Sequence, residues 1–211
     1  MKNKLYQKTI AVYNEMGRDY LKKITGLTPP EIYDFMKLLP KGGKVLDAGC
    51  AGGRDSQVFV KHSFKVVGVD LSEVLLKEAV KNVPEARFVK MDVKHLKFPT
   101  RSFDGIWANA ILVHVMKKDM SKTLKGFYRV LKPNGKMHIR VKRGKGKLNV
   151  NDFLPDGKHL PDGKYRLFTY FTKEEIKKFV WKAGFKIMPI EMIPDESKRK
   201  GVKWIKIWAE K

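Results

Sequence analysis

The residues with the clearest chemical meaning lie in a short loop between an apolar segment and a helix. Residues 43–46 are expected to form a buried strand that leads to the acid Asp47. Small side chains in the next residues let a ligand approach the backbone where a helix begins. These small residues are Gly49, Ala51, Gly52 and Gly53. The pattern indicates a turn for a nucleotide-containing cofactor. A dinucleotide is disfavoured, because the spacing G-x-G-x-x-G would put its third glycine at Arg54, which has a long side chain.

A second acid stands at the end of the next apolar segment, residues 64–70. The carboxylate of Asp70 can accept hydrogen bonds from both hydroxyls of a cofactor ribose. The structural alternative is an acid at a strand-to-helix corner, with Ser72 capping the helix that follows. Residues 86–92 form a third strand that ends at Asp92, where the same two interpretations apply. A fourth strand, residues 103–109, follows.

Together these segments resemble the class I S-adenosylmethionine (SAM) dependent methyltransferases. The first motif of that family runs acid-x-Gly-x-Gly-x-Gly, which Asp47, Gly49 and Gly53 fit, whereas Ala51 replaces the middle glycine. Four strand ends in the family's order are hard to obtain by chance. The resemblance covers residues 40–211 and implies SAM as the cofactor, with S-adenosylhomocysteine as the product.

The resemblance also implies roles for individual residues. Asp70 is expected to bind the ribose and Asp92 the adenine amino group. Arg54 is a candidate for the cofactor's carboxylate, with an ordinary helix-surface arginine as the alternative, and Asn109 is a candidate for orienting the cofactor's amino group or the substrate. The full set of expected cofactor-binding residues is Asp47, Gly49, Ala51, Gly53, Arg54, Asp70, Leu71, Asp92, Val93 and Asn109.

The catalytic candidate is His114, at the carboxyl end of the fourth strand. Methyl transfer from a sulfonium is an in-line displacement, for which alignment and exclusion of water matter most. A general base helps where the nucleophile carries a proton. The alternative is a histidine packed in the apolar turn at residues 110–115. The other histidines lack metal-ligand spacing, so we expect no metal site.

The elements that must position these residues follow a βαβ rhythm. Helices are expected at residues 53–62, 72–82 and 117–131. A turn at 133–135 leads into a fifth strand at 136–142, and a capping box at 172–175 begins a helix that Gly184 ends. The two final strands, 185–193 and 202–209, are expected to pair as a hairpin. The predicted fold class is α/β: a doubly wound, mostly parallel sheet of seven strands, the Rossmann-like methyltransferase fold, with an antiparallel C-terminal hairpin and an N-terminal helical cap.

The chain is expected to form a single domain over residues 1–211. Its parts are a helical cap at 1–40, a cofactor-binding core at 41–142, a substrate lid at 143–171, and a C-terminal helix with the hairpin at 172–211. The cap contains a helix at 3–23 and a second helix that a capping box at 28–31 begins. Cap and lid supply the substrate candidates Tyr13, Arg18, Tyr20, Tyr165 and Tyr170, for which ordinary packing is the alternative.

Composition limits the class of protein. A chain of 211 residues with 43% hydrophobic residues is long enough for one folded domain. No apolar run reaches the roughly 18 residues of a membrane span, and the N-terminus lacks the centre of a signal peptide, so we expect a cytoplasmic protein. The single cysteine, Cys50, excludes a disulfide within one chain and is expected to lie against the strand and the cofactor. A monomer is the default.

The formal net charge of +23 raises the question of the methyl acceptor. Basic residues concentrate between Lys117 and Lys147, which would suit RNA. Lysine greatly outnumbers arginine, however, as an AT-rich codon bias would also produce. A small-molecule acceptor is therefore the first prediction. The alternatives are an RNA base methyltransferase and a catalytically silent module that binds RNA.

Overall fold

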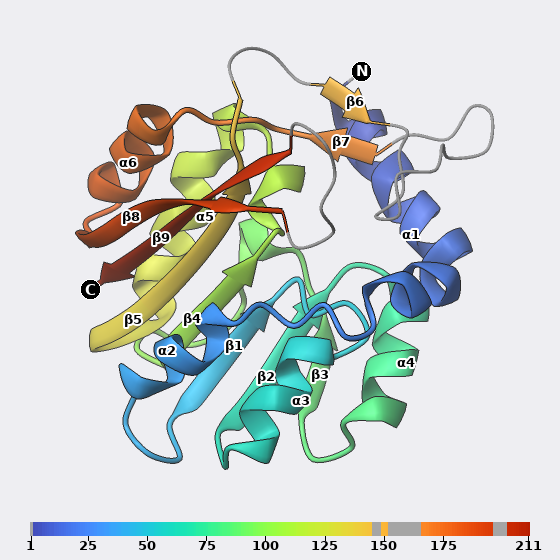
Figure 1. Ribbon diagram of the computed structural model, residues 1–211, viewed down its shortest axis with the longest axis horizontal. Helices are drawn as coiled ribbons and strands as arrows, with labels where there is room; N and C mark the ends of the chain where they lie inside the picture. The colour runs from blue at the N-terminus through green and yellow to red at the C-terminus, as the bar shows by residue number, and fades with distance from the viewer. Residues whose placement is uncertain (1, 145–148, 152–165, 196–201) are drawn as a thin grey trace.

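The computed structural model describes residues 2–144, 149–151, 166–195 and 202–211, and its main feature is a twisted sheet (Figure 1). Seven strands lie in the order β3-β2-β1-β4-β5-β9-β8. Strands β1 to β5 are parallel, whereas β9 pairs antiparallel with both β5 and β8. The strands are β1 (Lys44–Ala48), β2 (Lys65–Asp70), β3 (Arg87–Lys90), β4 (Phe103–Asn109), β5 (Leu131–Lys142), β8 (Lys186–Pro194) and β9 (Lys203–Glu210). The predicted fold class, including the C-terminal hairpin, is confirmed.

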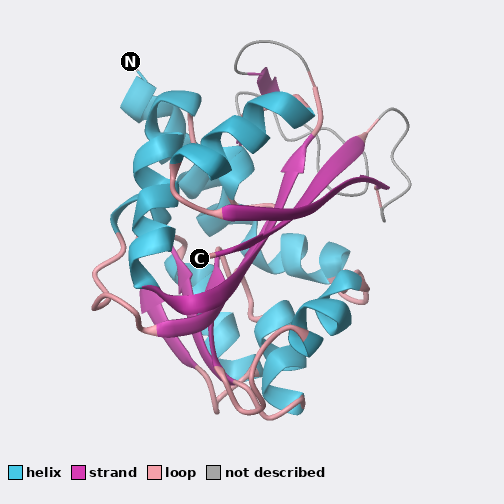
Figure 2. Ribbon diagram, turned by 90° about the vertical axis from the view of Figure 1, so that its left-hand side faces the viewer, coloured by secondary structure: helices cyan, strands magenta, loops and turns pink. Residues whose placement is uncertain are grey.

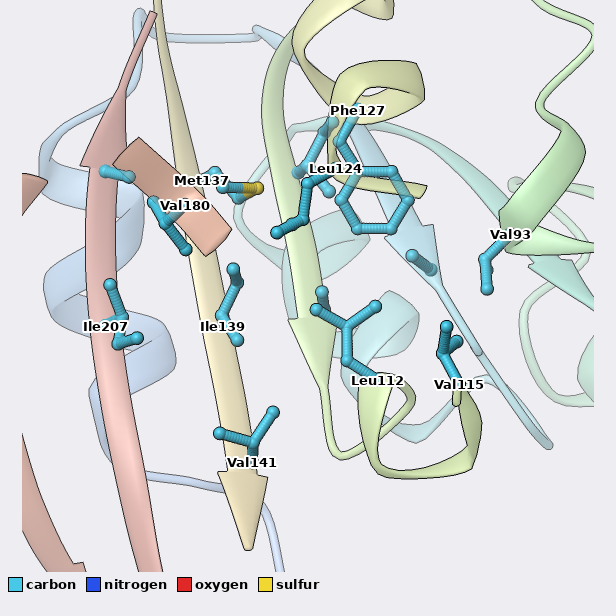
Figure 3. Close-up of a cluster of buried hydrophobic side chains, with 14 of the residues drawn as sticks. Val93, Leu112, Val115, Leu124, Phe127, Met137, Ile139, Val141, Val180 and Ile207 are labelled. Atoms are coloured by element: carbon cyan, nitrogen blue, oxygen red, sulfur yellow. The ribbon is translucent and has the colours of Figure 1, made fainter. Parts of the chain in front are cut away.

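Helices cover both faces of this sheet (Figure 2). They are α1 (Lys2–Ile24), α2 (Glu31–Lys37), α3 (Arg54–Lys61), α4 (Glu73–Asn82), α5 (Lys117–Val130) and α6 (Lys173–Lys182), with short 3-10 helices η1 (Val93–His95) and η2 (Leu112–His114). Successive strand side chains point to opposite faces. On β4, Ile106 and Ala108 therefore join the core under α5 and α6, whereas Trp107 joins the core under α2 and α3. Figure 3 shows the first of these cores, where Leu124 and Phe127 of α5 face the sheet beside Ile139.

The structure corrects three local predictions. Helix α2 begins at Glu31 with Pro30 at its N-cap and without a side-chain cap, so the predicted capping box at 28–31 does not form; its first amides bond to the carbonyls of Pro29 and Pro30 instead. The predicted turn at 133–135 is an irregularity inside β5, because Leu131 pairs with Phe103 and Lys136 pairs with Gly105. The third correction is a separate pair of strands.

Strands β6 (Asn149–Asn151) and β7 (Arg166–Phe168) pair antiparallel outside the main sheet. The sequence analysis expected an irregular lid over this region, most of which lies outside the described residues. Helix α1 contacts both β7 and α4, so it bridges from the lid region to the first half of the sheet (Figure 1). The side chain of Thr9 fixes this contact, because its hydroxyl accepts a hydrogen bond from the backbone amide of Leu167 at 2.8 Å.

Candidate active site

Two neighbouring cavities lie where the parallel strands end and α1 crosses them. Both cavities are open to solvent, and the space within them is about 690 Å³ in the first and about 910 Å³ in the second. Seven residues line both cavities and form the wall between them: Tyr13, Tyr20, Gly49, Ala51, Asn109, Ala110 and His114. Carboxyl ends of parallel strands are the usual place for ligands in open α/β sheets. The position of both cavities therefore agrees with the predicted site.

The loop after β1 has the backbone that a close ligand requires. Gly49 has φ 78°, and a Cβ there would lie 2.6 Å from the side chain of Ile111. Gly53 has φ 82° and occupies the N-cap of α3. Ala51 has φ 46°, which is the left-handed region that favours glycine. The replacement of the motif's middle glycine by alanine therefore keeps the glycine-like backbone, at a cost of about 1–2 kcal/mol.

Asp70 lies on the wall of the first cavity at the end of β2. Its carboxylate accepts hydrogen bonds from the amides of Ala51 at 3.1 Å and Ser72 at 2.9 Å. Burial raises the pKa of Asp70, and these amide bonds oppose the shift. Ser72 caps α4 by accepting from the amide of Leu75, as predicted. Asp70 thus stabilises the turn between β2 and α4 and also lines the first cavity.

The far end of the first cavity is apolar. Met91, Val93 and Leu71 line it, and α1 adds Tyr6 and Ile10.

Asp92 lies next to this wall. Its carboxylate accepts from the hydroxyl of Tyr6 at 3.0 Å and from the amide of Lys94 at 2.9 Å, and it caps η1. Asp92 is not among the described residues that line the cavity, but Tyr6, to which it is bonded, is one of them.

A buried polar network supports the wall between the cavities. Asp47 accepts from the hydroxyl of Ser56 at 2.6 Å, and burial raises its pKa. Asp55 accepts from Asn109 Nδ2 at 2.9 Å and from Trp107 Nε1 at 2.8 Å. The Nε of Arg54 lies 2.7 Å from Asp55.

Although burial opposes it, the neighbouring Arg54 guanidinium and these hydrogen bonds lower the pKa of Asp55. Sequence analysis missed Asp55, because nothing in its local sequence separates it from other acids in a first helical turn.

Asn109 keeps one polar atom available. Its Oδ1 is buried and accepts no hydrogen bond within the described part of the structure. Since Nδ2 is held by Asp55, the side chain presents a fixed acceptor to the wall of both cavities. Such an acceptor suits an ammonium group of a ligand.

Cys50 is buried beside β2, as predicted. A Cβ on Gly68 would lie 2.9 Å from its Sγ, so the thiol packs directly against that strand. Burial raises the pKa of the thiol well above its ordinary value. Cys50 therefore stays protonated and is unsuited to act as a nucleophile.

His114 lies at the junction of the two cavities in an ordered hydrogen-bond chain. Its Nδ1 is 2.6 Å from the carbonyl of Leu167, so Nδ1 carries the proton and donates. Its Nε2 is therefore an acceptor, 3.1 Å from the hydroxyl of Tyr13. The pKa of His114 is lowered to about 3, mainly by burial; the charges of Arg166 and Lys142 act in the same direction, and the Leu167 bond opposes them. The imidazole is consequently neutral at physiological pH.

Three buried cations line the second cavity. Arg140 and Lys142 come from β5 and Arg166 from β7, and they are 3%, 3% and 4% exposed. Arg140 and Lys142 belong to the basic run between Lys117 and Lys147, but they are interior and form no part of an exposed basic surface. The spacing of Arg140 and Lys142, two residues apart on a strand, was the available signal that both point to one face. Lys145 and Lys147 lie outside the described residues.

The predicted substrate residues divide into three groups. Tyr13 and Tyr20 line both cavities. Arg18 lies elsewhere, with an exposed side chain whose Nε is 3.2 Å from Glu78. Tyr170 packs beside Gly144 and lines neither cavity within the described chain, and Tyr165 lies outside the described residues.

Two negative findings concern the described residues only. No group of three or more His, Cys, Asp or Glu side chains among them could hold a metal ion. No helix in these parts of the chain is long and apolar enough to cross a membrane.

The order of the sheet and a site at its carboxyl edge define the Rossmann-like methyltransferase fold. Residues 45–135 match the family model described as a methyltransferase domain. A structural relative, the 1,6-didemethyltoxoflavin-N1-methyltransferase of Burkholderia thailandensis with bound 1,6-didemethyltoxoflavin and S-adenosylhomocysteine, superposes with a TM-score of 0.78 at 23% identity, over 100% of this chain and 89% of that one. Over residues 45–135, less than half of its length, the chain is similar to the methyltransferase domain, and its fold is that of the class I SAM-dependent methyltransferases.

Sequence relatives of named function match part of their length. A SAM-dependent Diels-Alderase of Talaromyces variabilis is 30% identical over 152 residues, which are 61% of this chain and 51% of that protein. A ubiquinone biosynthesis O-methyltransferase of Coxiella burnetii is 29% identical over 140 residues, which are 61% of this chain and 58% of that protein. The chain thus spans between half and three fifths of the length of these relatives.

SAM is the cofactor of this family, and the residues present fit it. The first cavity combines an acid at a strand end with an apolar wall, which suits a ribose and an adenine. The orphaned Oδ1 of Asn109 suits the ammonium of the methionine part. Gly49 leaves no room for a side chain where the cofactor would approach the backbone.

Proposed function

We propose that this protein transfers the methyl group of SAM to a small molecule held in the second cavity. The observation that carries the proposal is the shared wall, because it puts the cavity lined by Asp70 and Asn109 and a second, polar cavity in contact at His114 and Tyr13. Bound SAM supplies a methyl group on a positively charged sulfur. The protein's own task is to align the acceptor, exclude water and take up a proton.

The cofactor residues have separate tasks in this proposal. Asp70 binds the ribose hydroxyls while its backbone bonds keep it in place. Asn109 accepts from the ammonium, and Met91 and Val93 pack against the adenine. Tyr6 of α1 covers the same region, so the cap helix shields the cofactor from water.

His114 is the group that takes up the proton of the methyl acceptor, and Tyr13 passes that proton to it. Because Nδ1 is fixed as a donor, Nε2 is ready to accept a proton. The hydroxyl of Tyr13 donates to Nε2, so an acceptor proton can pass to the Tyr13 oxygen while the tyrosine proton moves to His114. The low pKa of His114 makes this base weak. It therefore suits an acidic nucleophile, such as a phenol or a ring N–H, better than an alcohol.

A small acceptor is supported by where the basic residues lie. Arg140 and Lys142 point into the second cavity, so the basic run is not one continuous face for RNA. Two relatives have names that refer to small molecules: a ubiquinone biosynthesis O-methyltransferase and a 1,6-didemethyltoxoflavin-N1-methyltransferase.

The test supplies methyl-labelled SAM to the purified protein together with a cell extract separated into RNA and small metabolites. We expect label in the small metabolites and its loss in the Asp70→Asn variant. An exposed control variant, His62→Gln, should label the metabolites normally. Label in RNA would overturn the small-molecule assignment. Absence of transfer, with SAM still bound, would overturn methyl transfer itself, an outcome made relevant by the relative named as a Diels-Alderase.

A further inference from the structure

We infer that Tyr6 of α1 recognises the adenine base of the cofactor. Its hydroxyl oxygen accepts a hydrogen bond from the adenine amino group, a contact that the sequence analysis expected from Asp92. The inference rests on the part of the proposed function that puts SAM in the first cavity, and it is independent of the methyl acceptor. It makes Tyr6 the residue that selects adenine over a base with a carbonyl at the same position.

Tyr6 brings a polar group to the apolar end of the first cavity. The side chain is buried and lines this cavity. Its hydroxyl bonds to Asp92, which lies in the chain between the cavity residues Met91 and Val93. Asp92 itself is not among the described residues that line the cavity. The hydroxyl of Tyr6 is therefore better placed than Asp92 to contact a base that packs against Met91 and Val93.

The direction of the hydrogen bond between Tyr6 and Asp92 decides what the hydroxyl can offer to a ligand. A phenol has one proton and a carboxylate only accepts, so Tyr6 donates its proton to Asp92 Oδ1 at 3.0 Å. Burial and the neighbouring charge of Asp92 raise the pKa of Tyr6, so the hydroxyl keeps that proton. Toward a base the oxygen can then only accept. The amino group of adenine is the complementary donor.

Lys94 holds both partners of this hydrogen bond in place. Its Nζ lies 3.8 Å from the centre of the Tyr6 ring and 3.4 Å from Asp92 Oδ2. Its backbone amide donates at 2.9 Å to the same Asp92 oxygen that accepts from Tyr6. Because the ring and the carboxylate are both fixed before a base binds, the hydroxyl oxygen is a preorganised acceptor.

Other hydroxyls among the described residues of the first cavity have different positions or partners. Thr9 donates to a carbonyl one turn earlier in α1 and accepts from an amide of β7. Ser72 donates to a side chain of α1 and caps α4. Tyr13 and Tyr20 belong to the wall that the two cavities share. Tyr6 is thus the hydroxyl that the structure offers to the base.

The experiment compares S-adenosylhomocysteine with S-inosylhomocysteine, in which a carbonyl replaces the adenine amino group, by calorimetric titration. We expect the wild type to bind the adenosyl compound at least about ten-fold more tightly, because the carbonyl would meet an oxygen that cannot donate. Tyr6→Phe should lose most of this preference, since it keeps the ring and removes the oxygen. Tyr33→Phe, at an exposed tyrosine of α2, should keep it. Full preference in Tyr6→Phe would overturn the inference.

A second variant tests the direction of the hydrogen bond. Asp92→Ala removes the acceptor of the Tyr6 proton, which is then free to be donated to a carbonyl. We expect S-inosylhomocysteine to bind about five-fold more tightly to Asp92→Ala than to the wild type, and this gain to be absent in Tyr6→Phe/Asp92→Ala. A direct contact between Asp92 and the base predicts weaker binding of S-adenosylhomocysteine and no such gain, which would overturn the inference. Circular dichroism shows whether each variant is folded, and the Tyr6→Phe result stands without Asp92→Ala.

The same titrations separate this inference from the proposed function. Equal binding of the two compounds by the wild type would overturn the inference and leave the cofactor site and methyl transfer intact. Binding of neither compound by the wild type would overturn the cofactor site of the proposed function, and the role of Tyr6 with it.

Discussion

His114 has two properties that sequence analysis treated as alternatives. The side chain is buried, as a packing histidine would be, and it also faces the wall between the two cavities. Both properties are compatible, because the carbonyl of Leu167 holds the proton on Nδ1 of the buried ring and leaves Nε2 as an acceptor. Burial therefore makes the imidazole neutral without removing it from the site.

Replacing His114 with glutamine should lower turnover at least about 100-fold, since general base catalysis is typically worth that much. Binding of S-adenosylhomocysteine should change little, because the cofactor residues stay in place. Both are measured with the labelled acceptor and by calorimetry, with His62→Gln as the exposed control. Unchanged turnover in the His114→Gln protein would exclude His114 as the base.

The same variant has a pH signature in the free energy of unfolding. The pKa of His114 is about 3 in the folded protein and about 6.5 when unfolded, so the unfolded chain binds more protons between these values. Wild-type stability attributable to this group is present above pH 6.5 and is lost as pH falls, by ~1.4 kcal/mol per pH unit. Between pH 6.5 and pH 5 the wild type should lose about 1.6 kcal/mol more than His114→Gln in urea titrations, because the slope is still rising near the unfolded pKa. Parallel losses in the two proteins would contradict the assigned environment.

Residues of the site differ in how far their sequence reveals them. Asp47, Gly49 and Asp70 follow strands directly, so a local pattern finds them. Arg166 does not, because only the contact between β7 and α1 brings it to Tyr13. At 3.6 residues per turn, Arg18 lies about 140° around α1 from Tyr13, whereas Tyr20 returns to the same face as Tyr13.

At the scale of elements, the cap helix and the cofactor loop fit each other closely. A Cβ on Gly52 would lie 2.5 Å from the side chain of Leu21, and one on Gly17 would lie 3.1 Å from Leu75. The loop therefore needs small residues on two sides, toward Ile111 at Gly49 and toward α1 at Gly52. Sequence analysis assigned these small residues to the ligand alone, since it could not know which helix packs over the loop.

The capping box at the start of α6 gives an element-scale prediction. Thr172 Oγ1 accepts from the amide of Glu175 at 3.1 Å, and the Glu175 carboxylate accepts from the amide of Thr172 at 2.9 Å. Thr172→Ala should lower the free energy of unfolding by about 1 kcal/mol in chemical denaturation, because it removes the cap. Ser121→Ala, at an exposed position within α5, should change it by less than about 0.5 kcal/mol. Equal effects in both variants would show that the box does not stabilise α6.

Strand positions were easier to predict than irregularities. Apolar runs located the seven strands of the main sheet to within a few residues, except that β5 begins at Leu131, before the predicted start at residue 136. The irregularity in β5 and the pairing of β6 with β7 depend on partner strands far along the chain, which a local pattern does not contain.

At the scale of the whole molecule, the basic residues of the 117–147 segment have several different environments. Lys117 pairs with Glu175 and Lys132 with Asp104, whereas Arg129 donates to the carbonyls of Leu96 and Phe98. Arg140 and Lys142 are interior. The exposed lysines of α5 remain, namely Lys118, Lys122 and Lys125. Net charge alone was therefore a poor guide to the partner, because it does not say which way each side chain points.

The central claim is that the first cavity binds the SAM scaffold through Asp70. The most direct measurement is a calorimetric titration of S-adenosylhomocysteine into the wild type and Asp70→Asn, with Asp19→Asn, an exposed acid on α1, as the matched control. We expect one molecule bound per chain in the wild type and in Asp19→Asn, and at least about ten-fold weaker binding in Asp70→Asn. No binding by the wild type, or equal binding by all three proteins, would contradict the account.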